Sequence, residues 1–286
     1  METRRRIRAV AREGHPEVPD PRPPTPRRRT AQGYANPQDP RGRQVFGKPA
    51  SLKDVPTHFC SGCGHGLVHR MVAEVVDELG IRERVVGVSP VGCAVLGYDY
   101  WDFDVSEAAH GRTPAVATGM KRARPDLIVF TYQGDGDLAA IGTAELIHTA
   151  NRGENITIIF VNNAVYGMTG GQMAPTTLEG QITATTPAGR TLEGCGAPLK
   201  VPEMIAPFPG TKYLVRTALN NPRNISIAKH SIKKAFQCQI ENVGFSLVEV
   251  LSPCPTYWRL SPLDALKWIE EKMIPYFPLG EIKVPN

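Results

Sequence analysis

Short apolar runs alternate with longer amphipathic segments along most of the chain. Five runs rich in Val, Ile, Phe and Tyr predict buried strands, at 84–89, 127–132, 156–161, 213–217 and 245–251. Five longer segments place apolar residues at helical spacing and predict helices, at 67–79, 115–122, 138–151, 225–240 and 261–273. Because strands and helices alternate, the pattern predicts an α/β domain with a mostly parallel sheet and helices on both faces.

The ends of two predicted helices carry their own signals. Gly80 follows the last apolar residue of the first helix, where a left-handed glycine commonly ends a helix. Thr113 and Pro114 suit the cap and the first turn of the helix 115–122. The segment 172–209 is rich in Thr, Gly and Pro and shows no period, so we expect a functional loop there.

The beginning of the chain differs from the rest in composition. Residues 1–45 contain eleven arginines, five acidic residues and eight prolines, with few large apolar side chains. Such a segment cannot bury enough surface to offset the entropy lost on ordering, so 1–47 is predicted to be a disordered extension. A basic arm that binds an acidic partner or nucleic acid and a start codon placed too far upstream are both open interpretations. We divide the remainder into an α/β domain, 48–260, and a C-terminal helix and tail, 261–286.

Charge and hydropathy restrict the classes of function. The whole chain has a net charge of +5, and its first 45 residues account for more than this excess. The rest therefore has no basic bias, and nucleic acid is not an expected partner. No apolar run reaches the roughly 18 residues that a membrane-spanning helix needs, and no signal peptide is visible. We therefore expect a cytoplasmic protein without a membrane partner.

Two polar clusters follow the two central predicted strands. The sequence GDGD occupies 134–137, and NN occupies 162–163. Open parallel sheets bind ligands at the carboxyl ends of their strands, which would bring both clusters to one edge. The Asp135 carboxylate and the Asn163 amide offer the hard oxygens that magnesium prefers, and glycine lets backbone N–H groups approach a phosphate. The alternative is a pair of tight turns without a ligand.

The chain has six cysteines. Cys60 and Cys63 form a C-x-x-C motif among glycines, which can hold a metal centre or form a redox disulfide. Cys93 and Cys254 each follow a predicted strand, at the edge that carries the polar clusters. Four thiolates suit a structural zinc ion or an iron–sulfur cluster equally well. The remaining two are not expected to take part, because a lone cysteine behaves as a small apolar residue; they are Cys195 and Cys238.

Taken in order, these motifs resemble the β subunit of the 2-oxoacid:ferredoxin oxidoreductases. The resemblance covers about 50–260 and rests on CSGCGHG at 60–66, GC at 92–93, GDGD with NNAVYGMT at 134–137 and 162–169, and SPCP at 252–255. The GHG after the C-x-x-C motif and the run YGMTGGQ are similar to the 2-oxoisovalerate and 2-oxoglutarate branch rather than to the pyruvate branch. The Arg/Pro-rich extension departs from the family pattern.

The resemblance implies a fold and a set of cofactors. It implies a single domain that binds the diphosphate half of thiamine diphosphate, with magnesium and a 4Fe–4S cluster beside it. The magnesium ligands would be Asp135, Asn163 and the Val165 carbonyl. The residues along the cofactor would be Gly92, Cys93, Gly136, Asp137, Gly167 and Met168. The cluster ligands would be Cys60, Cys63, Cys93 and Cys254.

The resemblance also implies an activity and partners. The activity is the coenzyme A-dependent oxidative decarboxylation of a 2-oxoacid to acyl-CoA and carbon dioxide, with ferredoxin as electron acceptor. The favoured substrates are 2-oxoisovalerate and 2-oxoglutarate. Thiamine enzymes need a second domain whose glutamate activates the aminopyrimidine, so we expect an α subunit with this pyrimidine-half domain, and γ and δ subunits are compatible with it. The aromatic and acidic loop 97–104 and the segment 172–209 are the expected covers of the exposed edge.

Two further residues are candidates for catalysis. His65 belongs to the glycine-rich motif, where it would contact substrate or cofactor. Arg112, with His110, precedes a predicted helix and would bind a substrate carboxylate, while simple capping is the alternative. His69 is expected on the surface of its helix.

Two other function classes fit part of the sequence. A non-oxidative thiamine decarboxylase subunit would use Asp135 and Asn163 but would leave the four edge cysteines without a role. A zinc-stapled binding module, with the basic extension gripping nucleic acid, would use the cysteines but not that pair. Visible absorption at about 400 nm with stoichiometric iron distinguishes the first interpretation from a colourless zinc protein.

Overall fold

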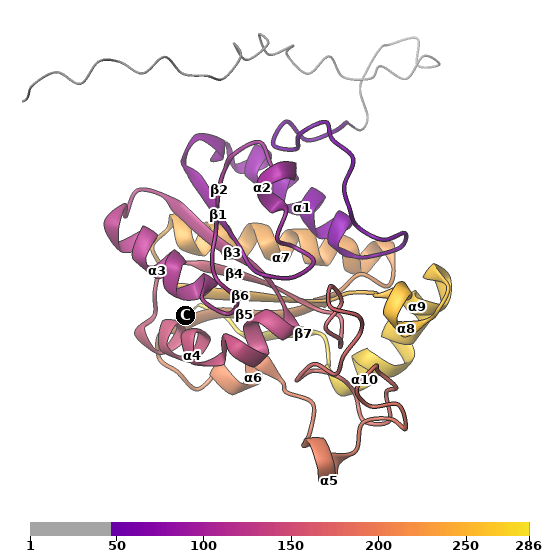
Figure 1. The fold of residues 1–286 in the computed structure, drawn as a ribbon. Helices are drawn as coiled ribbons and strands as arrows, with labels where there is room; N and C mark the ends of the chain where they lie inside the picture. The colour runs from indigo at the N-terminus through magenta and orange to yellow at the C-terminus, as the bar shows by residue number, and fades with distance from the viewer. Residues whose placement is uncertain (1–46, 286) are drawn as a thin grey trace, which may run out of the picture. The chain divides into compact units, whose positions relative to one another are not determined.

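The computed structural model describes residues 47–285, so the predicted extension lies outside the described residues except for Gly47. Residues Lys48–Asn286 form one compact unit. Its centre is a seven-stranded sheet with the strand order β2-β1-β3-β4-β6-β5-β7 (Figure 1). The strands are β1 Val85–Ser89, β2 Asp104–Glu107, β3 Ile128–Gly134, β4 Thr157–Asn162, β5 Thr211–Ala218, β6 Phe245–Leu251 and β7 Gly280–Lys283.

The sheet is mostly parallel. Of the strands in the described part of the chain, β7 alone pairs antiparallel, with β5. The inner strands β3, β4 and β6 are buried along almost their whole length. Strands that are covered on both faces have continuous apolar sequences rather than alternating ones, which is why the sequence identified them. The predicted α/β class is confirmed.

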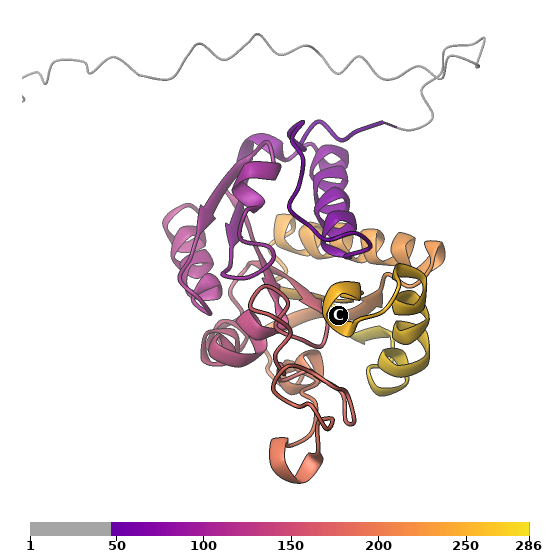
Figure 2. The same cartoon turned by 45° about the vertical axis from the view of Figure 1, so that its right-hand side comes forward.

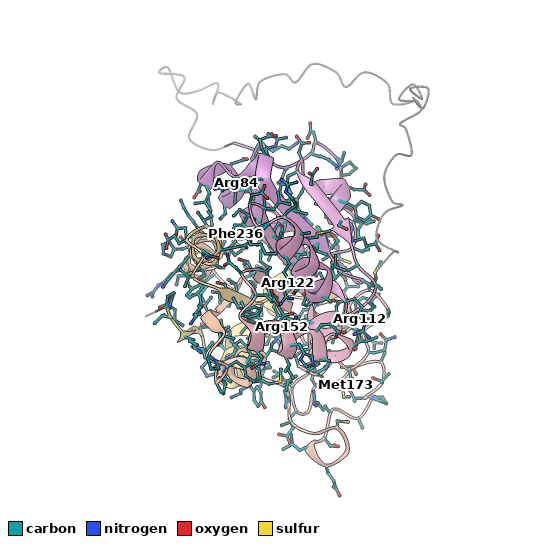
Figure 3. The ribbon with its side chains drawn as sticks, turned by 90° about the vertical axis from the view of Figure 1, so that its left-hand side faces the viewer. Arg84, Arg112, Arg122, Arg152, Met173 and Phe236 are labelled. Atoms are coloured by element: carbon teal, nitrogen blue, oxygen red, sulfur yellow. The ribbon has the colours of Figure 1, made fainter. Side chains whose placement is uncertain are left out.

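Helices cover the two faces of the sheet in separate layers (Figure 1). One layer consists of α1, His65–Leu79, and α7, Pro222–Ile240, which pack on the strands through a large apolar cluster. Phe236 of α7, labelled in Figure 3, meets Phe130 of β3 at a ring-centroid distance of 5.4 Å. The other layer consists of α3 Thr113–Ala123, α4 Thr143–Arg152 and α6 Val201–Ile205. Because both faces are covered, a ligand can reach the inner strands only at their ends.

A third apolar cluster joins the C-terminal segment to the carboxyl ends of the strands. Ile269, Met273 and Phe277 are fully buried there, against Ala218 of β5 and Leu251 of β6. The helices of this segment are α8 Pro255–Trp258, α9 Pro262–Trp268 and α10 Ile274–Tyr276, with a π-helix at Ile269–Met273. None of the helices in the described part of the chain is long and apolar enough to cross a membrane.

The sequence does not reveal the two edge strands. β2 follows the acidic segment 97–104, within which the structure forms α2, Gly97–Tyr100. β7 lies in the segment described from the sequence as a tail, where no strand was predicted, and its residues 280–283 pair with β5. Both strands are four residues long and partly exposed. They therefore lack the apolar run that marks the inner strands.

The helix ends follow the predicted signals in part, since Gly80 ends α1 and Pro114 lies in the first turn of α3. Gly80 has a φ of 62°, and its N–H closes the end of α1. Thr113 is not the cap of α3, because Arg112 occupies the N-cap position and the Thr113 hydroxyl is buried without a partner among the described residues. The predicted helix 138–151 divides into a π-helix, Asp137–Ile141, and α4.

Candidate functional site

The loops that follow β1, β3, β4 and β6 lie at the carboxyl edge of the sheet. They carry Cys93, Asp135, Asn163 and Cys254, respectively. From β1 the chain passes to β2, towards one edge of the sheet, and from β3 it passes to β4, towards the opposite edge. The direction of winding therefore reverses between the neighbouring strands β1 and β3. Open α/β sheets bind their ligands outside the carboxyl ends of the strands at such a reversal. The fold therefore places the candidate site at this edge.

Asp135 is a buried carboxylate at the end of β3. It is 2% exposed and accepts hydrogen bonds from the Thr176 hydroxyl at 2.7 Å and from the Gly136 N–H at 2.8 Å. Burial raises the pKa of Asp135 to about 7, although both hydrogen bonds act in the opposite direction. A buried carboxylate of this kind is stabilised by a cation beside it, and magnesium prefers such an oxygen. Asp135 therefore fits the predicted role of magnesium ligand.

The second predicted ligand, Asn163, begins a strained and buried turn after β4. Its neighbour Ala164 has a φ of 57°, a left-handed conformation that costs an alanine about 1–2 kcal/mol. The Val165 N–H donates to Asn163 Oδ1 at 3.4 Å, and the Trp258 indole N–H donates to the Asn163 carbonyl at 3.0 Å. Strain persists where surrounding contacts enforce it, and such positions cluster at ligand sites.

The irregular segment 172–209 reaches the site and is held by one arginine. Figure 2 shows it as a long excursion from the sheet edge, with the short helix α5, Leu192–Cys195, at its tip. The buried Arg190 guanidinium donates to backbone carbonyls at two separate parts of the segment, at 2.7 to 3.2 Å, namely those of Ala174, Pro175, Thr177, Cys195, Gly196 and Ala197. These bonds fix the turn that carries Thr176 to Asp135. No local signal in the sequence indicated this contact of Thr176 with Asp135.

Gly136 has no room for a side chain. A Cβ built on it would lie 2.2 Å from the ring of Tyr166, which belongs to the motif after β4. The motif after β3 therefore packs directly on the motif after β4, with the Gly136 backbone against the Tyr166 ring. Packing alone requires a glycine here, whether or not a phosphate also approaches this backbone.

We expect Gly136→Ala to displace Tyr166 and to destabilise the protein by about 1–3 kcal/mol, as overpacked sites do. Gly134→Ala is the matched control, because a Cβ on Gly134 meets nothing within 4 Å. Thermal unfolding of both variants beside the parent protein measures the difference. Equal unfolding temperatures for the two variants would contradict the contact.

The side chain of Asp137 ties neighbouring loops together instead of facing a diphosphate. Its Oδ1 accepts from the Gly111 N–H at 3.0 Å and the Val91 N–H at 3.3 Å, and lies 2.5 Å from the His110 Nδ1. Its Oδ2 accepts from the Gln133 amide at 2.7 Å. A carboxylate would also repel a phosphate. The predicted contact with the cofactor is therefore left to the backbone N–H of Asp137, at the start of the π-helix, an element that often marks functional sites.

Arg112, which is labelled in Figure 3, lies at the start of α3. Its half-exposed guanidinium forms an ion pair with Glu145 of α4. Arg112 is the N-cap residue of α3, although its side chain makes no capping hydrogen bond, so the capping alternative stays open. A substrate carboxylate would have to compete with Glu145 for the guanidinium. Binding of substrate by Arg112 stays a prediction.

Both histidines of α1 are buried. His65 is the first residue of α1, and its Nδ1 lies 2.7 Å from the Tyr132 hydroxyl. The prediction of a surface position for His69 is wrong, because Trp101 stacks on its ring at a centroid distance of 4.1 Å. Burial lowers the pKa of His65 to about 4 and that of His69 well below its usual range. The role of His65 stays a prediction, and as a neutral ring it would act through hydrogen bonds.

Two pairs of cysteines lie close together, Cys60 with Cys63 and Cys93 with Cys254, and the Gly64 N–H donates to the Pro253 carbonyl between the two pairs at 3.3 Å. The Cys63 N–H donates to the Cys60 carbonyl at 3.0 Å. A Cβ built on Gly167 would lie 3.1 Å from Cys93 Sγ and 3.9 Å from Cys254 Sγ, so one glycine separates these two sulfurs. Burial raises the pKa of Cys93 and of Cys254 to about 12. Thiols of such high pKa bind as thiolates when a metal replaces the proton.

Neighbouring thiols also contribute to the pKa shifts of Cys93 and Cys254. Beyond burial, the charges of Cys63 and Cys60 raise the pKa of Cys93, and the charges of Cys63 and Cys93 raise that of Cys254. No three His, Cys, Asp or Glu side chains among residues 47–285 are arranged to hold a metal ion, so the cluster ligands stay a prediction. The two excluded cysteines belong to other elements, Cys238 to α7 and Cys195 to α5.

The remaining predicted cofactor contacts are Gly92, Gly167 and Met168, and they differ in the space around them. The Met168 side chain is 53% exposed. Gly92 has a φ of 146°, which favours glycine, and an added Cβ would meet nothing within 4 Å. Space is therefore present beside both residues, whereas Gly167 is enclosed by the two sulfurs.

Known proteins resemble this chain over most of its length. Residues 91–250 match the thiamine pyrophosphate enzyme C-terminal TPP binding domain. The ketoisovalerate oxidoreductase subunit VorA of Methanothermobacter thermautotrophicus is 48% identical over 251 residues, which cover 84% of this chain and 53% of that protein. The 2-oxoglutarate synthase subunit KorB of Archaeoglobus fulgidus is 39% identical over 217 residues, which cover 76% of this chain and 77% of that protein. This chain thus spans about half the length of its VorA relative.

A solved structure shares the fold. It is the 2-oxoglutarate:ferredoxin oxidoreductase from Magnetococcus marinus with 2-oxoglutarate, coenzyme A and succinyl-CoA bound, which matches with a TM-score of 0.70 and 27% identity over 85% of this chain and 86% of that chain. The matched TPP binding domain contains the motifs of Asp135 and Asn163. By these similarities the chain belongs to the 2-oxoacid:ferredoxin oxidoreductase family, as a member that carries the thiamine pyrophosphate binding domain.

Proposed function

We propose that this chain is the thiamine-diphosphate-binding subunit of an enzyme that oxidatively decarboxylates a 2-oxoacid and reduces ferredoxin. One observation carries the proposal: the buried Asp135 carboxylate, the Asn163 turn, Cys93 and Cys254 follow strands at the carboxyl edge of one parallel sheet, and the Gly64 N–H beside Cys63 donates to the Pro253 carbonyl beside Cys254 at 3.3 Å. The names of the VorA and KorB relatives support the reaction class. A non-oxidative decarboxylase would leave the cysteines without a role.

The residues of the edge have separate tasks in this proposal. Asp135, Asn163 and the Val165 carbonyl would hold magnesium, and the backbone of Gly136 and Asp137 would face the diphosphate. Thiamine diphosphate, when bound, supplies the electron sink that lets a 2-oxoacid lose carbon dioxide. Thr176 holds the Asp135 carboxylate in place through its hydroxyl, at 2.7 Å. The buried surroundings exclude water from this side of the site.

The cysteines would take the electrons away from the site. Cys60, Cys63, Cys93 and Cys254 would hold a 4Fe–4S cluster. Of these, Cys254 is buried and Cys60 is exposed. The group therefore extends from the sheet edge to the surface. A small electron acceptor such as ferredoxin could approach at Cys60, one electron at a time.

The substrate is proposed to be 2-oxoisovalerate or 2-oxoglutarate, with coenzyme A as acyl acceptor. The names of the VorA and KorB relatives and the ligands of the Magnetococcus marinus structure support this choice. Arg112 would bind the carboxylate of the 2-oxoacid by opening its ion pair with Glu145. His65 would contribute a neutral ring near the cysteines.

The complete site is proposed to include a second subunit that carries the pyrimidine-half domain. Three partly or largely exposed apolar side chains occur in the loops of the carboxyl edge, namely Val91, Met168 and Ile182. A partner subunit would cover them together with the exposed side of the cofactor. Further γ and δ subunits would complete the complex.

Co-expression tests this function. We expect the purified chain alone to be inactive, and the complex with a pyrimidine-domain subunit to reduce ferredoxin in the presence of coenzyme A under anaerobic conditions. Comparison of 2-oxoisovalerate, 2-oxoglutarate, pyruvate and an aryl pyruvate identifies the substrate. Decarboxylation by the chain without other subunits would contradict the shared site. A complex that releases carbon dioxide without reducing ferredoxin would favour the non-oxidative alternative.

A further inference from the structure

A row of buried polar side chains lies behind the candidate metal turn. Asn162, the last residue of β4, is fully buried. Its Nδ2 donates to Glu249 Oε1 at 2.7 Å, and its Oδ1 accepts from the Ala164 N–H at 3.2 Å. An amide has distinct donor and acceptor ends, and here each end has one partner. The two bonds together therefore fix which way the Asn162 amide points.

Glu249 sets this orientation from the neighbouring strand. It lies on β6, fully buried, and its Oε2 accepts from Arg216 Nε at 2.6 Å. Arg216 lies opposite Glu249 on β5 and also donates to both oxygens of Glu203 on α6, at 2.7 and 2.6 Å. Both oxygens of Glu249 thus accept from N–H groups. A carboxylate can do this, whereas an amide cannot.

The turn needs such anchors because Ala164 is left-handed without being a glycine. Its N–H is held by Asn162, and its carbonyl accepts from the Thr177 hydroxyl at 2.7 Å and from the Gln181 amide at 3.2 Å. Asn162 is therefore one anchor from the sheet, beside the Asp135 carboxylate, which also interacts with the Ala164 N–H, and the other two anchors come from the irregular segment. Loss of the Asn162 bond would let Ala164 relax towards an ordinary backbone conformation. The adjacent Asn163 and Val165 would then move.

We propose that Glu249, acting through Asn162, is a positioning residue for the turn that presents the predicted magnesium ligands Asn163 and Val165. This inference rests on the proposed function, because it assigns the turn to the magnesium and diphosphate site. Neither side chain touches the cofactor in this proposal. They set the backbone geometry of residues that do.

Glu249→Gln tests the donor and acceptor order without changing the shape of the side chain. A glutamine keeps one acceptor, which the charged Arg216 retains, and turns its NH2 group towards Asn162. Asn162 must then rotate to offer its oxygen, which turns its own NH2 group towards the Ala164 N–H. Two donors face each other, and the turn is released. We expect Mg²⁺-dependent affinity for thiamine diphosphate to fall about 10- to 100-fold, as it does when groups that orient metal ligands are changed.

A second substitution should restore the order. In Asn162→Asp with Glu249→Gln, the glutamine donates to one oxygen of the aspartate, and the other oxygen accepts from the Ala164 N–H. We expect affinity within about threefold of the parent in this double variant. Asn162→Asp alone places its buried carboxylate against that of Glu249, and the repulsion between them should weaken the binding of thiamine diphosphate. Glu203→Gln is the matched control, because it changes a partner of Arg216 that does not contact the turn.

The measurement uses the full chain purified with its partner subunit and stripped of metal. Thiamine diphosphate is titrated at fixed Mg²⁺ by calorimetry and by tryptophan fluorescence, since the Trp258 indole is bonded to Asn163 and reports on the turn. The thermal midpoint of each metal-free protein records its stability. Weak binding by Glu249→Gln, recovery in the double variant and near-parent binding by Glu203→Gln support the proposal.

Three results would overturn the inference while the proposed function stands. The first is parent-like affinity for thiamine diphosphate in Glu249→Gln, and the second is a double variant whose affinity does not recover. The third is tighter binding of thiamine diphosphate by Asn162→Asp alone, which would mean that the added charge matters and the orientation of the amide does not. A parent protein that binds no thiamine diphosphate in Mg²⁺ would instead overturn the proposed function, and the inference with it.

Discussion

Asp135→Ala is expected to abolish retention of thiamine diphosphate while leaving iron content unchanged. Asp135 is the one carboxylate in the predicted magnesium set, and its surroundings are buried. Changes to groups that merely orient metal ligands cost 10- to 100-fold in affinity, so loss of a ligand should cost at least about 100-fold. Calorimetric titration of thiamine diphosphate in Mg²⁺ measures the loss, and elemental analysis measures iron.

Asp135→Asn separates loss of binding from loss of stability. The amide keeps the shape of the side chain, and the Thr176 hydroxyl, now 2.7 Å from the carboxylate, can turn to accept from its NH2 group. Burial raises the pKa of Asp135 to about 7, so above pH 7 the metal-free parent holds an ionised group that burial disfavours. The asparagine variant holds none. We therefore expect it to unfold, without metal, at a temperature no lower than the parent above pH 7.

The two variants together distinguish a ligand from a structural residue. If the Asp135 carboxylate had only a structural role, the Asp135→Asn protein would be less stable than the parent. Its folded molecules would still bind the cofactor with the affinity of the parent. A ligand gives a stable protein that does not bind. Native affinity in either variant, measured in Mg²⁺, would remove Asp135 from the site. The same result would weaken the assignment of Asn163, which rests on the same pair of motifs.

The inner part of the fold was predictable because burial on both faces leaves a clear pattern. β3, β4 and β6 are continuous apolar runs, and the polar motifs follow directly after them in the sequence. The edge strands β2 and β7 are short and partly exposed, so packing against one neighbour decides their conformation. Propensity and periodicity do not contain that information.

The chemistry of the site was predictable where the residue type itself carries it. Asp135, Asn163, Cys93 and Cys254 are candidates because of their ligand atoms and their place after strands, and Cys60 and Cys63 because of their C-x-x-C spacing; their roles stay predictions. The contacts that hold them are tertiary: Thr176 and Arg190 come from a segment without periodicity. No local pattern could have shown that this segment folds back on Asp135.

The prediction of a surface position for His69 is wrong because a distant part of the chain covers this residue. His69 has the spacing of a half-exposed helical position, and Trp101 from the loop after β1 stacks on it. The carboxylate of Asp137 likewise bonds to Gly111 and His110 from the loop after β2, a contact that the sequence did not indicate, and the contact of Asp137 with a diphosphate stays a prediction. In both cases the covering residue lies more than 20 positions away, beyond the reach of a local motif.

The cysteines provide the second large effect. Cys60→Ser, Cys63→Ser, Cys93→Ser and Cys254→Ser are each expected to lose the iron–sulfur cluster and ferredoxin reduction. Cys195→Ser and Cys238→Ser are expected to keep both. The physical reason is proximity: Cys93 and Cys254 border the same glycine, and their pKa values respond to Cys63. A serine hydroxyl is a far poorer ligand for iron than a thiolate. Iron and sulfide content, with visible absorption of anaerobically prepared protein, measure the outcome.

Cys254 and Cys238 form a matched pair within this set. Both are buried, at 7% and 5% exposure, so replacing either thiol by a hydroxyl imposes a similar cost on folding. They differ in position, since Cys254 follows β6 at the sheet edge and Cys238 lies inside α7. Loss of iron in Cys254→Ser alone therefore cannot be attributed to burial of a hydroxyl. Full iron in Cys254→Ser with loss in Cys238→Ser would move the fourth ligand to α7. A colourless parent with stoichiometric zinc would instead favour the zinc-stapled module, because four thiolates bind that ion equally well.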